Sequence, residues 1–547
     1  MTRATSTARR HLVWAAVVAV PVAFLAVFFA WPLLVVLGHG LRGTGAADAW
    51  DVLSSHATTD AIVTTLLLAT AGTVGSLALG LPGAYVLHRL RWRGQRAIRA
   101  LVTVPFVLPT VVVAAAFTAL LGRRGPLGWL GIEQSATAIA LALVFFNVAV
   151  VIRIVGVRWA ALDPSRALAA RTLGASRWRA WHTVTLPALG SSIRSASAAT
   201  FLFCSTSFAL VLIVGGTRVR TVETEMYLQV NVFLNLHAAA VLALVQVVIV
   251  AFALLLTARV RKGADAIGAG RDLDGSRAAV AADRPVIAAV LTALGLLLVA
   301  PVVALVLRSL RVAGGGLGFD NYVALVRPPA RTVLPVSVAE AALNSLVTAG
   351  IATAIVVVLA VPIAIAAYRG PRWTRLVDGA AMAPLGVSAV VVGLGLLLTL
   401  NREIAGVDLR TSWWLVPIAQ AIVALPLTLR VVVPAARAID ARLAVAAGTL
   451  GASPWRAWRT IDAPLLRGPV VLALAFAFGI AVGEFGATAF VARPDRPTLP
   501  TAIARLLSRP GAENVGMAFA SAVLLAALVA VVLLATESVR TRVEAAL

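Results

Sequence analysis

The chain has 547 residues, of which 60% are apolar and only 13% are charged, and its mean hydropathy is +0.95. These values lie outside the range of soluble globular domains and indicate a protein that crosses the membrane several times. The formal net charge is +24. We interpret this charge as a topology signal that faces anionic lipid, so the expected partner is membrane lipid and no nucleic acid.

Twelve charge-poor segments each have the roughly 20 apolar residues that a helix needs to cross about 30 Å of hydrocarbon. The predicted fold class is therefore all-α integral membrane. The first run follows Arg9 and Arg10 but is longer than a signal-peptide core, so an uncleaved span is expected. The predicted spans are 13–37, 61–86, 100–121, 135–157, 192–214, 237–258, 286–307, 340–367, 379–400, 413–436, 469–491 and 514–536.

The placement of arginine sets the expected orientation. With the amino terminus in the cytoplasm, about 30 basic residues fall on the inner side and about 15 on the outer side, which is the bias of cytoplasmic loops. Both termini are then cytoplasmic.

One stretch occurs twice. Residues Asp163–Leu189 return as Asp440–Leu466 at a constant offset, 440 − 163 = 277, without a gap. The chain is thus an internal duplication. Six predicted spans per repeat place both copies on the cytoplasmic face, so the repeats are parallel. The predicted domains are a first repeat at 1–270 with its core at 61–258, a cytoplasmic linker at 271–285, and a second repeat at 286–547 with its core at 340–536.

Each copy of this loop is expected to form a helix, a glycine turn and a second helix. In the first copy, Asp163 is the N-cap residue, Gly174 ends the first helix and Ser176 caps the second. Pro187 is expected to interrupt the second helix. The corresponding residues of the second copy are Asp440, Gly451, Ser453 and Pro464. A structural amphipathic hairpin and a docking site both fit the pattern, and its occurrence twice favours docking of a two-fold partner.

The sequence Ala-Ala, then Leu-Gly-Ala-Ser, Trp-Arg and a later Pro resembles the EAA loop in permease subunits of ATP-binding-cassette importers. The resemblance implies the fold of binding-protein-dependent importer permeases, with each short helix seated as a coupling helix in an ATP-hydrolysing subunit. Leu168 and Val445 replace the glutamate that names the motif, which puts its charged contact in doubt. The coupling loops would comprise Asp163, Ala169, Ala170, Leu173 and Gly174, and Asp440, Ala446, Ala447, Leu450 and Gly451.

The sequence has no ATPase site of its own. A phosphate-binding P-loop needs a lysine after its glycines, and the only lysine is Lys262 in Arg-Lys-Gly. We therefore expect no catalytic residues, no metal site and no bound cofactor, with ATP used by a partner. The resemblance implies two copies of a nucleotide-binding ATPase subunit, an extracytoplasmic solute-binding protein, and a location in the inner (plasma) membrane of a bacterium.

Few polar residues fall inside the predicted spans. Glu484 is the only carboxylate away from the ends of these spans, and it aligns with Ser207 of the first repeat. It could face the translocation path and favour a cationic solute, or bond neighbouring helices and backbone. Glu223 and Glu225 are expected at an outer vestibule, as exposed groups. The repeat-related pair Arg153 and Arg430 is expected to reach the inner headgroups.

Fused permeases of this length resemble thiamine and ferric-iron import systems. Phe145-Phe146-Asn147, Ser207-Phe208 and Thr221-x-Glu223-x-x-x-Tyr227 are similar to the thiamine type, and Gly483–Thr488 is similar to sulfate and molybdate permeases. The predicted function is therefore the permease subunit of an ATP-driven importer, with thiamine as the first candidate solute and ferric iron as the alternative. An ion-coupled secondary transporter is the alternative of another class, but Glu484 lacks the matching acid that such a site needs in the other repeat.

Overall fold

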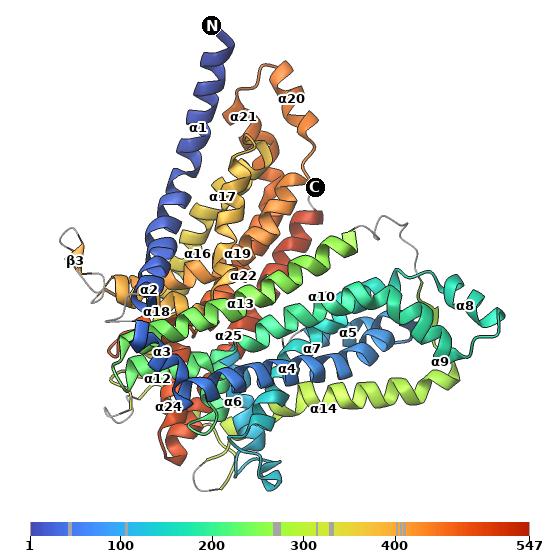
Figure 1. The fold of residues 1–547 in the computed structure, drawn as a ribbon, viewed down its shortest axis with the longest axis vertical. Coiled ribbons are helices and arrows are strands. Elements are labelled where there is room, and N and C mark those ends of the chain that lie inside the picture. The colour runs from blue at the N-terminus through green and yellow to red at the C-terminus, as the bar shows by residue number, and fades with distance from the viewer. Residues whose placement is uncertain are drawn as a thin grey trace. The chain divides into compact units, whose positions relative to one another are not determined.

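A computed structural model describes residues 2–41, 46–103, 105, 108–265, 275–312, 315–327, 333–400, 403–404, 407–408 and 412–545. Its contacts divide the chain into two compact helical units (Figure 1). The first unit is Ala47–Gly318, and the second unit is Met1–Ala46 together with Phe319–Leu547. Each unit contains one copy of the repeated loop.

The first unit is built around three helices, α4, α7 and α10, which pack against one another. Helix α13 lies against α10 and α12, and α14 lies against α6. The elements are α3 (Ala46–Ser54), α4 (His56–Ala84), β1 (Leu90–Arg91), α5 (Gln95–Thr103), α6 (Thr110–Leu121), α7 (Ala136–Ala160), α8 (Pro164–Thr172), α9 (Arg177–Ala180), α10 (Leu186–Ser205), α11 (Phe208–Leu210), α12 (Val222–Asn231), α13 (Leu236–Asp265), β2 (Arg277–Ala278) and α14 (Arg284–Ser309).

The second unit repeats this plan with α16, α19 and α22 as the mutually packed helices, and α25 lies against α22 and α24. The elements are α1 (Thr2–Leu25), α2 (Trp31–Leu41), α15 (Asp320–Ala324), α16 (Val338–Arg369), α17 (Thr374–Ala381), α18 (Ala389–Thr399), β3 (Glu403–Ile404), β4 (Val407–Asp408), α19 (Leu415–Arg437), α20 (Ala441–Thr449), α21 (Pro454–Ala457), α22 (Ala463–Gly483), α23 (Thr488–Val491), α24 (Leu499–Ser508) and α25 (Ala512–Ala545).

The helices that precede the core of each repeat pack in the unit that contains the other core. Helices α1 and α2, at the start of the chain, lie against α16 and α18 of the second unit, whereas α14 lies against α6 and α4 of the first. The predicted repeat boundaries at 270 and 286 describe the duplication in the sequence. The contacts divide the chain by a different criterion, so these boundaries stay a prediction. Hydropathy indicates that a helix is apolar but does not specify which neighbour it contacts.

All twelve predicted spans correspond to helical segments, but four of them are broken or short, including 469–491, where α22 ends at Gly483 and α23 begins at Thr488. Within the described residues, nine helices are long and apolar enough to cross a membrane. The predicted spans at 192–214 and 379–400 are helix pairs bent by 53° and 99°. The span predicted at 100–121 contains only the last residues of α5 and then the short apolar helix α6, which begins after Pro109.

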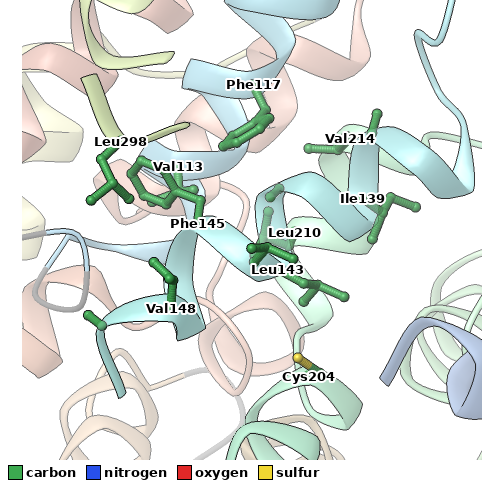
Figure 2. Packing of buried hydrophobic residues seen from close by; sticks show 14 of the residues in the cluster. Val113, Phe117, Ile139, Leu143, Phe145, Val148, Cys204, Leu210, Val214 and Leu298 are labelled. Atoms are coloured by element: carbon green, nitrogen blue, oxygen red, sulfur yellow. The ribbon is translucent and has the colours of Figure 1, made fainter. Parts of the chain in front are cut away.

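The core of the first unit depends on close contact between α4 and α7. A Cβ atom at Gly72 would lie 2.7 Å from the Cys204 sulfur and 3.1 Å from Cβ of Leu143, so only glycine fits there. Small residues at such positions let membrane helices approach closely. Phe117 and Phe145 meet edge to face in the same cluster, with ring centroids 5.6 Å apart (Figure 2).

Candidate coupling loops and buried polar site

The first copy of the repeated loop has the predicted helix ends. The Oδ1 atom of Asp163 accepts a hydrogen bond from the amide of Ser165 at 2.9 Å and caps α8. Gly174 follows the helix with φ of +89°, which only glycine adopts without strain. The amide of Ala175 donates to the carbonyl of Ala170 at 3.1 Å across this turn. The Ser176 hydroxyl then accepts from the amide of Arg179 at 3.2 Å and caps α9.

The second copy has the same caps and the same glycine turn. Asp440 accepts from the amide of Arg442 at 2.9 Å, and Gly451 has φ of +81°. The amide of Ala452 donates to the carbonyl of Ala447 at 2.9 Å. Ring pairs stack at an interplanar angle of 19° in both copies, Trp178 with Trp181 and Trp455 with Trp458. Two separate parts of the chain therefore form one surface motif twice.

Each copy exposes an apolar ridge. Leu173 and Leu450, which follow α8 and α20, are 89% and 88% exposed. The residues at the position of the motif glutamate, Leu168 and Val445, are exposed as well. Ala169 and Ala446 are exposed, while Ala170 and Ala447 are half-buried. Leucines this exposed at the turn after a helix are typical of surfaces that contact a partner.

The predicted interruption by proline is wrong. Pro187 lies in the first turn of α10, and one helix runs without a break from Arg177 to Ser205. A π-helical turn at Trp181–Thr185 precedes the proline, and a second one at Trp458–Asp462 precedes Pro464. A π turn inserts one residue without ending the helix, and in both copies it lies directly before the turn that contains the proline, so the helix continues through the proline instead of stopping there.

In each unit an arginine at the end of a long helix, α4 in the first unit and α16 in the second, contacts the repeated loop. Arg89, at the end of the π turn after α4, donates to the carbonyl of Leu162 at 3.0 Å. In the second unit, Arg369 at the end of α16 forms an ion pair with Asp462 at 2.5 Å. Asp462 is 2% exposed and Arg369 20% exposed, so this pair is shielded from water. The repeated loop is therefore held against the end of α4 in the first unit and against the end of α16 in the second.

The linker contacts the same end of the first unit. Strand β2 pairs in parallel with β1, and Gly275 donates its amide to the carbonyl of Ala160 at 2.7 Å. Arg277 holds Asp283 through two hydrogen bonds of 2.7 Å and donates to the Tyr85 hydroxyl at 2.9 Å. The described part of the linker is thus fixed beside the first loop.

The amino-terminal helix reaches the corresponding end of the second unit. The indole N–H of Trp373, between α16 and α17, donates to Nδ1 of His11 at 2.9 Å. In Figure 1 the start of α1 lies at the same end of this unit as α20 and α21. Arg153 and Arg430 are exposed on α7 and α19, two turns before those helices end.

Glu484 lies at a helix break rather than within a helix. Both carboxylate oxygens accept backbone hydrogen bonds, from Ala487 at 2.8 Å and from Thr488 at 3.0 Å. The carboxylate thereby binds the two amides at the start of α23 and is 6% exposed. Its counterpart Ser207 lies at the break between α10 and α11, and its hydroxyl donates to the carbonyl of Phe203 at 2.8 Å. Of the two roles the sequence left open for Glu484, these contacts match bonding to backbone.

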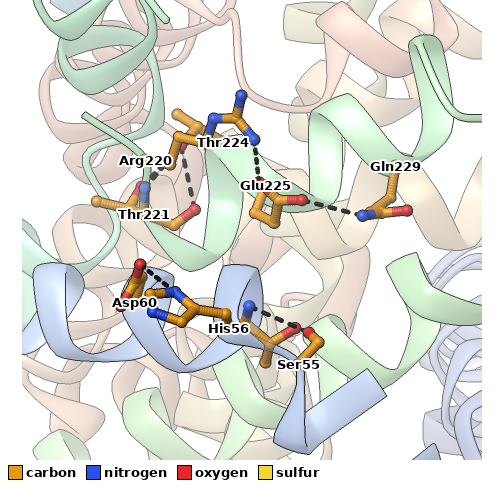
Figure 3. Close-up of polar contacts among 9 residues, drawn as sticks. Ser55, His56, Asp60, Arg220, Thr221, Thr224, Glu225 and Gln229 are labelled. Carbon is orange, nitrogen blue, oxygen red and sulfur yellow. Dashed lines mark hydrogen bonds and ion pairs between the residues drawn. The ribbon is translucent and has the colours of Figure 1, made fainter. Parts of the chain in front are cut away.

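The expected exposure of Glu223 and Glu225 is wrong, because both are buried, at 2% and 1%. They belong to α12, which packs against α13 and α4 instead of forming a loop. Glu225 accepts from Gln229 at 2.9 Å and pairs with Arg220 at 3.4 Å (Figure 3). Glu223 accepts from Gln246 of α13 at 3.1 Å. Ten residues are too short for a sequence pattern to separate a buried helix from a loop.

Two buried amides lie beside the break between α10 and α11; Asn147 was singled out from the sequence only as part of a family signature, and Gln246 was missed. Gln246 is fully buried and also donates to the carbonyl of Ser205 at 3.1 Å, and Asn147 of α7 donates to the Cys204 sulfur at 3.4 Å. The side-chain carbonyl oxygens of Asn147 and Gln246 accept no hydrogen bond from the described residues. Amides in otherwise apolar spans were the signal that could have found them.

The comparisons identify the family. A profile of binding-protein-dependent transport system inner membrane components matches residues 76–262 and 356–545, which together exceed half of the chain. The chain belongs to this family, with two copies of its domain, and is an ATP-binding-cassette importer permease. Membership excludes the ion-coupled secondary transporter.

Named relatives are permeases too. The thiamine transport system permease protein ThiP of Escherichia coli K12 is 27% identical over 433 residues, 76% of this chain and 77% of the relative. The probable ABC transporter permease protein y4fN of Sinorhizobium fredii is 27% identical over 87% of each chain. The molybdenum transport system permease protein ModB of Mycobacterium tuberculosis is 34% identical over 38% of this chain and 81% of its own. A solved bacterial transporter that imports alginate matches 48% of this chain at 16% identity, with a TM-score of 0.40.

Proposed function

We propose that this chain is the membrane path of a thiamine importer in a bacterial inner membrane. The similarity to ThiP carries the proposal, because it extends over about three quarters of both chains, whereas the sulfate and molybdenum permeases align with a third or so of this chain. ThiP of Salmonella typhimurium is similar to the same extent.

The buried polar site supports a cationic solute. Glu223 is a buried carboxylate of the first unit. The side-chain N–H groups of Asn147 and Gln246 donate to Cys204 and Ser205, adjacent residues of α10, while their carbonyl oxygens accept no hydrogen bond from the described residues. Buried acceptors without a donor cost free energy unless a solute or water satisfies them. A thiazolium-type cation would gain from all three groups. This charge pattern does not favour an anionic solute.

The two loops would be the coupling sites for a pair of ATPase subunits. Their backbones agree in every cap and turn, which suits two identical partners. Since Leu168 and Val445 stand where the family motif has glutamate, the ridge that ends in Leu173 or Leu450 would contact an apolar part of the ATPase cleft. Both loops and both termini would be cytoplasmic, with the extracytoplasmic binding protein delivering solute on the opposite side. ATP would bind only to the partner subunits.

A coupling test uses the double variant Leu173→Asp/Leu450→Asp. A charge on an exposed ridge leaves the fold intact but is desolvated in a cleft, so we expect co-purification with the ATPase and thiamine uptake to fall at least tenfold. Leu317→Asp changes a leucine outside both loops that is also largely exposed, at 72%, and this control should keep both co-purification and uptake. Full complex formation by the double variant would exclude the coupling role.

Solute identity is tested by uptake of labelled thiamine into proteoliposomes that contain this chain, its ATPase and its binding protein. Glu223→Gln removes one charge with little change of shape, and loss of a charge-assisted contact of about 1.5–3 kcal/mol predicts at least tenfold weaker uptake. The control is Glu340→Gln, an exposed carboxylate that caps α16. Uptake of ferric iron in place of thiamine would contradict the proposed solute.

A further inference from the structure

The second unit contains a cavity of about 240 Å³ that no sequence pattern indicated. Its walls come from the first half of α16, the start of α19 and the segment between α23 and α24. The polar and aromatic wall residues are Asn344, Thr348, Trp413, Arg493, Arg496 and Thr498. A cavity with two arginines and an indole differs from the apolar gaps expected between membrane helices.

The charges at this cavity do not cancel. Arg493 holds Asp495 through its Nε and Nη2 atoms at 2.8 and 3.0 Å, and this pairing keeps the pKa of Asp495 below its usual range. Asp495 is therefore ionised at neutral pH. Arg496 is exposed and forms no ion pair with the described residues. Two guanidinium groups and one carboxylate leave an excess positive charge beside the cavity.

Two helix starts add to this positive potential. Thr498 is the N-cap residue of α24, and Val416 lies in the first turn of α19; both are part of the cavity wall. The N-terminus of a helix carries a partial positive charge and has amides without intrahelical acceptors, so it favours an anion. The charged side chains and the backbone thus act in the same direction.

The level of the cavity along α16 places it at the opposite surface of the second unit from the repeated loop. Thr348 precedes Arg369, which is tied to that loop through Asp462, by 21 residues, or roughly 32 Å at 1.5 Å per residue. This length is close to the thickness of the hydrocarbon layer. Leu343 and Val347, one turn apart on α16, line the cavity and are exposed. Arginine and tryptophan above an apolar helix face are typical of the headgroup level.

The fold itself does not require these residues. At the offset of 277, Arg493 and Arg496 correspond to Gly216 and Val219, and Trp413 corresponds to Ala136. The first repeat therefore builds the same architecture without this set. The segment between α11 and α12 of the first repeat carries arginines at other positions, Arg218 and Arg220, and Arg220 pairs with Glu225.

We propose that this cavity binds a phosphate group, presented either by a phospholipid headgroup or by a phosphorylated solute. The guanidinium fork of Arg496 matches the geometry of phosphate oxygens, and Arg493 and the two helix starts complete the charge. The cavity is smaller than the 300–1,000 Å³ or so of pockets for drug-sized ligands, so it accommodates the phosphate and a few neighbouring atoms. This site is separate from the acidic site in the first unit.

The test measures binding to the purified full-length chain in detergent, without ATPase or transport. Phosphatidylglycerol is titrated by native mass spectrometry and inorganic pyrophosphate by calorimetry. We expect Arg496→Gln to weaken binding of the active probe at least tenfold and Arg493→Gln to weaken it as well. Arg218→Gln, the same charge change in the exposed loop of the first repeat, should alter it less than twofold.

The two probes distinguish the sources. Binding of phosphatidylglycerol alone identifies a lipid headgroup, and binding of pyrophosphate identifies a phosphate carried by a soluble molecule. If neither probe binds, or if Arg218→Gln weakens binding as much as Arg496→Gln does, the proposal is wrong. Because transport is not measured, these outcomes are independent of whether the chain imports thiamine.

Discussion

The turn glycines of the two loops are selected by backbone conformation. Their φ angles of +89° and +81° cost a residue with a Cβ roughly 1–2 kcal/mol. A Cβ atom at Gly174 or Gly451 would meet no heavy atom within 4 Å, so space is not the constraint. The angle between α8 and α9, and between α20 and α21, therefore depends on these two residues.

We expect Gly174→Ala/Gly451→Ala to reduce coupled uptake several-fold, because strain at the turn shifts α8 and α20. The asparagine double variant should lose less, since asparagine tolerates the left-handed region. ATP-dependent uptake in proteoliposomes measures both. Equal losses for alanine and asparagine would show that backbone strain is not the cause.

Asp163 gives a prediction that depends on pH. Hydrogen bonds from the hydroxyl and then the amide of Ser165 lower the pKa of this carboxyl. A lowered pKa means that the cap is fully stabilising above the ordinary aspartate pKa of about 4 and is lost as the pH falls through the lower, folded value. The protection factor for hydrogen exchange in the first turn of α8, which is corrected for the pH dependence of intrinsic exchange, should accordingly be constant near neutral pH. Asp163→Ala should speed this exchange at neutral pH, and Asp163→Asn should not, because asparagine also caps. Equal exchange in the two variants would contradict the cap.

At the scale of elements, features that depend on local sequence could be predicted and features that depend on neighbours could not. The caps at Asp163 and Asp440 and the turns at both glycines follow from residue types a few positions apart, and they are present. The π turns before Pro187 and Pro464 could not be predicted, because a π turn has no composition of its own. The burial of Glu223 could not be predicted either, because it depends on contact with α13, a separate helix of the bundle.

The helix break at Glu484 is a second element-scale feature. Glutamine keeps one oxygen acceptor where the carboxylate offers two, so Glu484→Gln should leave one buried amide of α23 unpaired at a cost of about 1–3 kcal/mol. We expect a lower midpoint of thermal unfolding for the purified chain. Glu484→Ala should lower it further. An unchanged midpoint with reduced thiamine uptake would instead assign Glu484 to the translocation path.

The buried ion pair between Arg369 and Asp462 links two elements. Removing one partner of such a pair leaves an uncompensated charge and typically costs about 3–5 kcal/mol. Asp462→Leu should therefore destabilise the second unit strongly, and Arg369→Met/Asp462→Leu should recover most of the loss. A double-mutant cycle on thermal unfolding measures the coupling, and additive effects would contradict a direct pair.

At the scale of the whole molecule, the repeats in sequence and the units in space do not coincide. The duplication and the apolar spans were visible in the sequence, and so was the fold class. The exchange of α1–α2 and α14 between units was not, because membrane helices select neighbours by shape rather than by apolar content.

Deletion of residues 2–41 tests this arrangement. Helices α1 and α2 contact α16 and α18, so hydrogen exchange should rise in those helices of the second unit. It should stay unchanged in α4 and α7 of the first unit, which serves as the internal control. Faster exchange confined to α4 and α7 would show that the amino-terminal helices belong to the repeat they precede.

The interleaved units have a consequence for biosynthesis. Helices α1 and α2 are synthesised hundreds of residues before their contact partners in 319–547. During synthesis they therefore lack these partners while the first unit is completed by α14. A gene interrupted between the repeats would encode two polypeptides, each lacking a helix that the other supplies. A single polypeptide instead supplies both helices in equal number and pairs the two halves within one molecule.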